Sequence, residues 1–209
     1  MEEKTLNEQE SIALISRMIQ NSKKNLQMGS GNSFLLWGYL CAGTALLVYV
    51  LVTLTKLEYA NFAWLLIPVV GFPLELRLRR KRVKPVTTYI DKVLGTVWRN
   101  VGFGILAWMV VLFIYPLVDE DWDWSVMQLM VPFSLIMCAA GAMFSGSILR
   151  DRWMEISAGA AFIVALPTVL SYILESLTPI YPLYALCFVL MMVIPGHRLN
   201  RKAKDEKHV

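Results

Sequence analysis

The residues that most suggest catalysis are a serine in one apolar segment and a histidine after a later one. Ser145 is followed by Gly146, and His197 follows the pair Pro195-Gly196. A serine becomes a nucleophile when a neighbouring histidine accepts its proton, and the reaction then needs hydrogen-bond donors for the oxyanion that forms. These residue types would indicate an intramembrane serine hydrolase, provided that the fold brings them together.

The surrounding sequence argues against a protease. Intramembrane proteases of the rhomboid type carry Gly-x-Ser-Gly, whereas this chain reads Met143-Phe-Ser-Gly and lacks the first glycine. Ser145 and His197 are also both expected at the cytoplasmic ends of their segments, while the rhomboid pair opens towards the outer face. No oxyanion donors can be identified, so we predict no catalytic residue. Gly141, Ser145 and Gly146 are better explained as small residues that let helices approach closely.

Arg99 lies well inside an apolar segment, where a charge is costly. The simpler interpretation is that its long side chain reaches the nearby headgroups by snorkelling. A functional interpretation places it in a polar cluster with Asn100 and with Glu75 or Glu155, which are acids at comparable depth. A transporter uses such a charge to bind an anion or to gate a pathway.

The histidines and cysteines do not form a metal-binding pattern. Cys41, Cys138 and Cys187 fall in three different apolar segments without CxxC spacing, and His197 and His208 are separated. The cysteines are therefore predicted to be buried free thiols, and two separated histidines do not make a zinc site. We predict neither a metal nor a cofactor.

The elements that must carry these residues are long apolar helices. Of the 209 residues, 56% are apolar and 17% are charged, whereas soluble domains carry about 25% charged residues. A helix needs about 20 apolar residues to cross the hydrocarbon of a bilayer. The sequence predicts an all-α membrane bundle of six transmembrane helices, at about residues 34–54, 60–76, 93–118, 126–149, 156–173 and 181–194.

The basic residues set the expected orientation. Of the 20 Lys and Arg residues, all except Lys56 lie near the termini or near the connections after the second and fourth segments, while the acidic run 119–121 follows the third segment. Basic loops stay in the cytoplasm during insertion, so we expect both termini there, in a bacterial inner membrane. One basic run is expected to contact lipid headgroups rather than nucleic acid: Arg77, Arg79, Arg80, Lys81, Arg82 and Lys84.

Residues 5–26 form the expected soluble element, an amphipathic cytoplasmic helix. Ile12, Ile15 and Ile19 recur at helical spacing, and the segment Met28-Gly-Ser-Gly-Asn32 is expected to break the helix before the first span. The expected organisation is thus a cytoplasmic helix and linker (1–32), the bundle (33–196) and a basic cytoplasmic tail (197–209). The apolar stripe could pack on the bundle, associate with a second copy or bind a protein partner; the mixed charge of the polar face disfavours the membrane surface.

The six segments also read as three hairpins. Each returning segment ends in glycine or proline followed by bases, at residues 71–77, 141–150 and 194–198. A duplicated hairpin would produce this pattern, as in some transporters. Glycine and proline are also common at the ends of unrelated helices, which would produce the same pattern. No fixed period in the sequence decides between the two.

The chain resembles a family of uncharacterised bacterial membrane proteins with a short amphipathic helix before the first span. The resemblance rests on Phe34-Leu-Leu-Trp-Gly38, Thr88-Tyr-Ile-Asp91, Ser145-Gly146 and Ile194-Pro-Gly-His197. It implies a multi-span bacterial inner-membrane protein and supplies no catalytic residue.

Two functions follow from these features. We expect a non-enzymatic accessory, sensor or scaffold protein whose cytoplasmic helix binds a partner. The alternative is a small transporter or lipid-handling membrane protein that uses Arg99 and helices broken by proline. The prolines concerned are Pro68, Pro73, Pro132 and Pro167.

Overall fold

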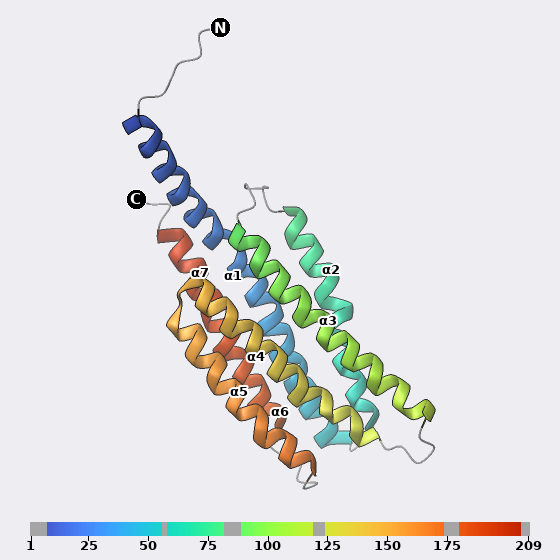
Figure 1. Cartoon of the computed structure of the whole chain (residues 1–209). Helices are drawn as coiled ribbons and strands as arrows, with labels where there is room; N and C mark the ends of the chain where they lie inside the picture. The colour runs from blue at the N-terminus through green and yellow to red at the C-terminus, as the bar shows by residue number, and fades with distance from the viewer. Residues whose placement is uncertain (1–7, 56–57, 82–88, 119–123, 174–179, 206–209) are drawn as a thin grey trace.

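The computed structural model describes residues 8–55, 58–81, 89–118, 124–173 and 180–205, and Figure 1 shows their arrangement. Within these ranges every residue is helical except Arg150 and Asp151. The long apolar segments explain this result, since a helix satisfies all its backbone hydrogen bonds internally in an apolar setting. The all-helical prediction is confirmed.

The helices follow one another as six rods joined by short connections. Three are single α-helices, and the other three begin or continue in a different helical form. The elements are α1 (Glu8–Thr55), the 3₁₀ segment η1 (Glu58–Leu65) with α2 (Leu66–Lys81), α3 (Tyr89–Val118), the 3₁₀ segment η2 (Trp124–Leu129) with α4 (Met130–Leu149), α5 (Arg152–Ile173), and α6 (Ile180–Phe188) with the π segment η3 (Val189–Val193) and α7 (Ile194–Asp205).

The rods lie side by side, and successive rods run in opposite directions (Figure 1). α1 packs against α2, α6 and α7, while α4 packs against α3 and α5. The core between them contains fully buried small residues such as Ala45, Ala139 and Ala158, together with Tyr184 and Phe188. Small residues at helix contacts allow the backbones to approach closely, which favours packing without a large polar contribution.

Four helices are long and apolar enough to cross a membrane, within the parts of the chain that the structure describes. They are Gly31–Thr55, Tyr89–Tyr115, Met130–Leu149 and Ile180–Arg201. Their exteriors are strongly apolar: Leu54, Phe103 and Phe144 are all exposed, as expected for side chains that face lipid. These features define a multi-pass membrane protein of the helix-bundle class.

The interruption expected at residues 28–32 is wrong. α1 runs without a break from Glu8 to Thr55. A glycine costs a helix about 1 kcal/mol relative to alanine, but Gly31 lies against α7, where a side-chain carbon would be 2.8 Å from the carbonyl oxygen of Gly196. Gly31 therefore serves a close helix contact. The first residues of the expected amphipathic helix, 5–7, lie outside the described residues.

The helix of the sixth predicted span does not end near residue 194 but continues through Pro195 and Gly196 to Asp205. Proline removes one backbone donor and clashes with the preceding turn of an α-helix. The widened π segment η3 ends at Val193, two residues before Pro195, and the backbone N–H of Ile194 bonds to the carbonyl of Val189. A π segment of this kind offers the extra room that a proline needs.

The expectation of proline-broken helices is wrong at Pro73 and Pro167, whereas Pro68 and Pro132 lie just after a change from 3₁₀ to α-helix. Pro73 and Pro167 lie inside the continuous helices α2 and α5. Pro68 and Pro132 each occupy the third position of an α-helix, within the first turn, where the missing N–H has no partner to lose. Pro182 occupies the same position in α6, so all three returning rods share this arrangement.

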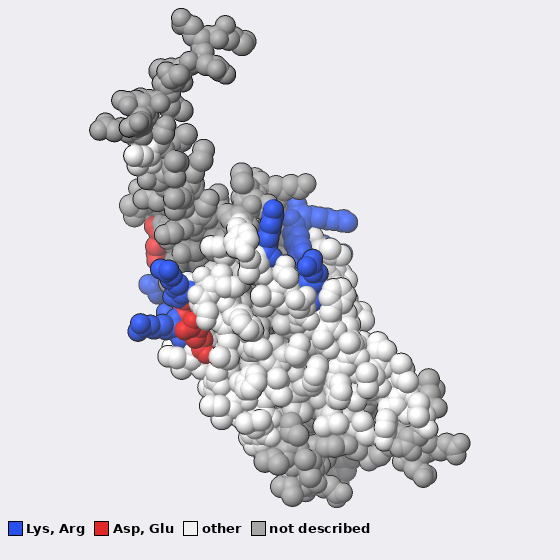
Figure 2. All heavy atoms as spheres, in the orientation of Figure 1, with Lys and Arg blue, Asp and Glu red and all other residues white. Residues whose placement is uncertain are grey.

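The basic side chains gather towards the end of the bundle at which α1 begins. Figure 2 shows two groups of them, one over α2 and the start of α3, the other beside the α4–α5 connection and α7, while the opposite end of this face is free of charged residues that the structure describes. The exposed bases of these elements are Arg77, Arg79, Arg80, Lys92, Arg99, Arg150, Arg152, Arg198 and Arg201. The molecule therefore has one basic end.

Candidate functional site

The polar cluster expected around Arg99 is not assembled. Arg99 and Asn100 are exposed on α3, Glu155 is half-buried at the start of α5, and Glu75 is buried in α2. No hydrogen bond or ion pair joins Arg99 to either acid in the part of the chain that the structure describes. The outward position of Arg99 leaves its side chain free to extend towards the basic end.

Glu75 instead connects α1 with the basic end of α2. Its Oε1 accepts a hydrogen bond of 2.9 Å from Ser33 Oγ on α1 and one of 2.9 Å from Arg79 Nε, four residues further along α2. The side chain of Glu75 is 9% exposed and that of Arg79 is 69% exposed. A buried carboxylate thus holds an outward-facing guanidinium at one nitrogen.

The other oxygen of Glu75, Oε2, is buried and has no hydrogen-bond partner among the described residues. A buried acceptor without a partner is costly, and more so for a carboxylate in an apolar setting. Sequence reasoning identified Glu75 as a polar residue at depth but could not find Ser33, because 42 positions separate the two and no pattern links them.

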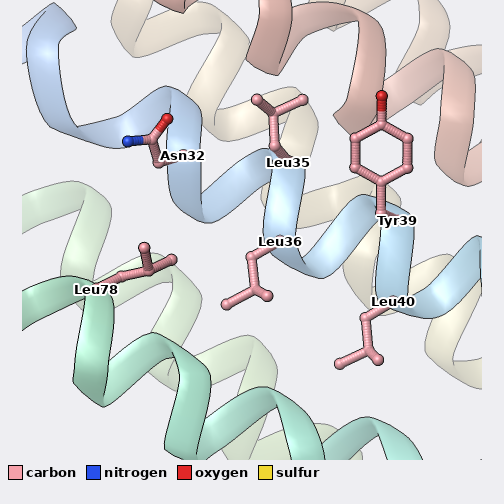
Figure 3. A pocket seen from close by; sticks show the side chains of 6 residues that line it. All are labelled: Asn32, Leu35, Leu36, Tyr39, Leu40 and Leu78. Atoms are coloured by element: carbon pink, nitrogen blue, oxygen red, sulfur yellow. The ribbon is translucent and has the colours of Figure 1, made fainter.

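A shallow, open apolar groove of about 540 Å³ lies between α1 and α2, next to this contact (Figure 3). α1 supplies Leu35, Leu36 and Leu40, and α2 supplies Leu78. Figure 3 shows Leu78 facing the α1 side chains across the gap between the two helices. A groove with this lining suits an alkyl chain better than a polar ligand.

Two polar pairs border the groove on the side of α7. Tyr39 Oη lies 2.8 Å from Nε2 of His197, and Asn200 Nδ2 donates to Asn32 Oδ1 at 2.7 Å. Tyr39 and Asn32 are also lining residues of the groove. The groove is therefore apolar along its floor and polar along one edge, close to the basic end of the bundle.

Ser145 and His197 do not form a nucleophile–base pair. Ser145 is fully buried, where its Oγ accepts a hydrogen bond from Trp98 Nε1 at 3.0 Å and donates one to the carbonyl of Gly141 at 2.7 Å. His197 is bound to Tyr39 on another helix. The hydroxyl of Ser145 thus joins α3 to α4 and has no base beside it.

Gly141 and Gly146 both lie at close helix contacts. A side-chain carbon at Gly141 would lie 2.9 Å from Cγ2 of Val101 on α3, and one at Gly146 would lie 2.9 Å from the backbone nitrogen of Glu155 on α5. Any larger residue would push these helices apart. The two glycines fit the small-residue role proposed for them from the sequence.

A contact between the α4–α5 connection and α7 was not found from the sequence. The Oδ1 of Asp151 accepts hydrogen bonds from the backbone N–H groups of Trp153 (3.1 Å) and Met154 (3.4 Å), which satisfies donors at the start of α5. The same oxygen lies 4.0 Å from the guanidinium of Arg198, which is 5.8 Å from the ring centre of Trp153. An aspartate directly before a helical segment is an N-cap signal that could have revealed part of this arrangement.

The three cysteines are buried free thiols, as predicted. All three belong to the central core, together with Tyr184, whose hydroxyl lies 2.9 Å from Ser134 Oγ. No group of three or more metal-ligating side chains occurs among the described residues. The thiols therefore contribute to packing.

Comparisons with known proteins found no relative of this chain. No family model matches the chain, and no curated protein and no solved structure matches it either. The class stated above, a multi-pass membrane helix bundle, thus rests on the sequence and the fold.

Proposed function

We propose that this chain is a six-span protein of a bacterial inner membrane, with both termini in the cytoplasm, that acts as a non-enzymatic scaffold or sensor. Its partner binds the part of α1 that extends beyond the bundle. The observation that carries this proposal is the continuity of α1, because a binding event at one end of an unbroken helix is transmitted directly to the packed span.

The length of α1 supports an extension outside the membrane. α1 has 48 residues, which corresponds to about 72 Å at ~1.5 Å per residue, whereas the hydrocarbon layer is about 30 Å thick. Figure 1 shows the first turns of α1 reaching beyond the other helices at the basic end. The candidate span Gly31–Thr55 takes 25 of these 48 residues, so just under half of the helix is left for an extension on the proposed cytoplasmic side.

The sequence of this extension favours a helical partner. Ile12, Ile15 and Ile19 follow the 3–4 spacing of a coiled-coil seam, and Ile12 is 65% exposed. An apolar stripe at this spacing is stabilised by packing against another helix. That helix can belong to another protein or to a second copy of the chain.

The test is a triple substitution of the stripe, Ile12→Ser, Ile15→Ser and Ile19→Ser. Serine and isoleucine have similar helix propensities, so the helix should persist while the apolar seam is lost. The matched control replaces residues on another face: Ala13→Ser, Gln20→Ser and Asn21→Ser.

The measurement is crosslinking in membranes, followed by purification in a mild detergent and mass determination of the crosslinked species. We expect the wild type and the control to give one defined crosslinked complex, and the stripe variant to lose it. A monomer without a partner in the wild type, or a complex that survives in the stripe variant, would contradict the proposal. The mass of the complex distinguishes a second copy from another protein.

A second function, the handling of lipids, is supported by the groove in Figure 3. Leu36→Trp should fill the groove and reduce the amount of lipid that co-purifies, whereas Leu46→Trp, at an exposed position of α1 outside the groove, should not. Equal lipid content in the two variants would remove the support for this function. The transporter reading of Arg99 has no comparable support, since Arg99 faces outwards.

A further inference from the structure

One face of α2 combines exposed apolar side chains with arginines. Val69, Phe72 and Leu76 are 67%, 47% and 56% exposed, and Arg79 and Arg80 follow them. Positions separated by three, four, seven or eleven residues lie on the same side of an α-helix, so these five side chains form one continuous stripe. The stripe is apolar at its first part and basic at its end.

The stripe has the length of one lipid leaflet. From Val69 to Arg80 the helix rises about 16 Å, at ~1.5 Å per residue, and half of a hydrocarbon layer of about 30 Å is ~15 Å. An acyl chain that lies along Val69, Phe72 and Leu76 would therefore place its phosphate beside Arg79 and Arg80. This match in length, together with the charge at the end, identifies a phospholipid as the molecule that fits the face.

Glu75 determines how Arg79 is presented. Its carboxylate is anchored to α1 by Ser33 and bound to Arg79 at Nε. An arginine has five N–H donors in a planar fork, and a bond at Nε leaves the four donors of the terminal nitrogens for another ligand. Phosphate oxygens suit this fork because they can accept two parallel hydrogen bonds.

The cost of burying Glu75 supports a role beyond packing. One of its oxygens is buried without a partner, and a neutral or apolar residue would pack between the helices without that cost. What the carboxylate adds is the fixed position of Arg79. A general attraction between the basic end and anionic lipids would not need a buried acid beside Arg79.

We propose that the face of α2 formed by Val69, Phe72, Leu76, Arg79 and Arg80 binds one anionic phospholipid, and that Glu75 is the positioning residue that directs Arg79 to the lipid phosphate. The proposal rests on the membrane placement proposed above, and it goes beyond a general attraction of the basic run to headgroups. Because Ser33 belongs to α1, the bound lipid also contacts, through Glu75, the helix that extends towards the partner.

The test measures lipid binding to the purified full chain by native mass spectrometry, with phosphatidylglycerol and phosphatidylcholine of identical acyl chains. We expect the wild type to bind phosphatidylglycerol at least about tenfold more tightly, which corresponds to ~1.4 kcal/mol. Equal affinity for the two lipids would overturn the anionic specificity.

Charge-conserving variants separate a positioned arginine from a diffuse positive surface. Arg79→Lys keeps the charge but loses the fork and the bond at Nε, and it should weaken phosphatidylglycerol binding by about tenfold. Arg152→Lys is the matched control, because Arg152 is exposed at the start of α5 and does not belong to the face of α2, and it should leave the affinity within about twofold. Equal effects of the two variants would overturn the proposal.

Glu75→Gln tests whether the carboxylate of Glu75 strengthens or weakens the binding of the anionic lipid. If Glu75 acted only through its charge, its removal would strengthen the binding of an anionic lipid. If it positions Arg79, the same variant weakens binding, and Ser33→Ala weakens it in the same direction by a smaller factor. An increase in affinity for Glu75→Gln would therefore contradict the positioning role.

The outcome is independent of the partner proposal. Arg79→Lys should not alter the crosslinked complex formed through the α1 stripe, and the stripe variant should not alter phosphatidylglycerol binding. A loss of lipid binding with an intact complex, or the reverse, shows which of the two proposals has failed.

Discussion

Gly196 of α7 lies against the backbone of Gly31 in α1. A side-chain carbon at residue 196 would lie 3.1 Å from the carbonyl oxygen of Gly31, and one at residue 31 would lie 2.8 Å from the carbonyl oxygen of Gly196. The two helices therefore cross at a point where neither can carry a side chain. This contact joins the first helix of the chain to the last at the basic end of the bundle.

Gly31→Ala should destabilise the bundle by about 1–3 kcal/mol, because the added methyl would press on the side chain of Asn200 and on the carbonyl oxygen of Gly196, a backbone atom that cannot rotate away. Gly43→Ala on the same helix is the control, since nothing lies within 4 Å of a side-chain carbon there, and it should be neutral or slightly stabilising through helix propensity. The free energy of unfolding in detergent micelles measures both. Equal losses for the two variants would show that the close crossing does not hold α1 and α7 together.

The hydrogen bond from Trp98 to Ser145 should couple α3 to α4. We expect a double-mutant cycle of Trp98→Phe and Ser145→Ala to give a coupling energy of about 0.6 kcal/mol, the average for hydrogen bonds between membrane helices, and no more than the maximum of ~1.7 kcal/mol. The same unfolding assay provides the four free energies. Additive effects of the two substitutions would mean that the bond contributes nothing to stability.

Asp151 should stabilise the bundle mainly as the cap of α5. Asp151→Ala removes the acceptor for the N–H groups of Trp153 and Met154 and should cost about 0.5–2 kcal/mol. Asp151→Asn keeps a capping oxygen and removes the charge that faces Arg198, in a partly exposed and weak ion pair. The unfolding free energy should fall clearly for alanine and slightly for asparagine; similar losses would assign the effect to the charge.

The helical class could be predicted from the sequence because it depends on local properties. Apolar segments of about 20 residues leave the backbone few alternatives to a helix in lipid. Most Lys and Arg residues lie between these segments or at the termini, so their placement can be seen in the sequence as well. The four spans found at Gly31–Thr55, Tyr89–Tyr115, Met130–Leu149 and Ile180–Arg201 correspond to predicted segments. The second and fifth predicted segments form α2 and α5, and their placement in a membrane stays a prediction.

The continuity of α1 and of the last helix could not be predicted, since it depends on contacts between distant segments. Glycines 29 and 31 and the pair Pro195-Gly196 are local signals for the end of a helix. Gly31 and Gly196 instead allow one crossing of two uninterrupted helices, and η3 provides room for Pro195. The contact between Gly31 and Gly196 thus outweighed the local helix-ending signals in both helices.

The candidate site was predicted only in part for the same reason. A buried acid at residue 75 and a basic run after it are visible in the sequence, but the pairing of Glu75 with Ser33 depends on how α1 and α2 cross. Arg99 was the more conspicuous charge, and the fold places it on the outside of α3. Depth along a helix can be estimated from sequence, whereas the direction that a side chain faces requires the packing.

The central claim, six spans with the basic end in the cytoplasm, is tested most directly by reporters inserted into the full chain. Alkaline phosphatase forms its disulfides only on the oxidising outer side of the membrane, and green fluorescent protein serves as the cytoplasmic reporter. We predict active phosphatase after Asp123 and after Glu175, and fluorescence without phosphatase activity after Lys84 and at the C-terminus. Fluorescence without phosphatase activity after Asp123 would contradict the account.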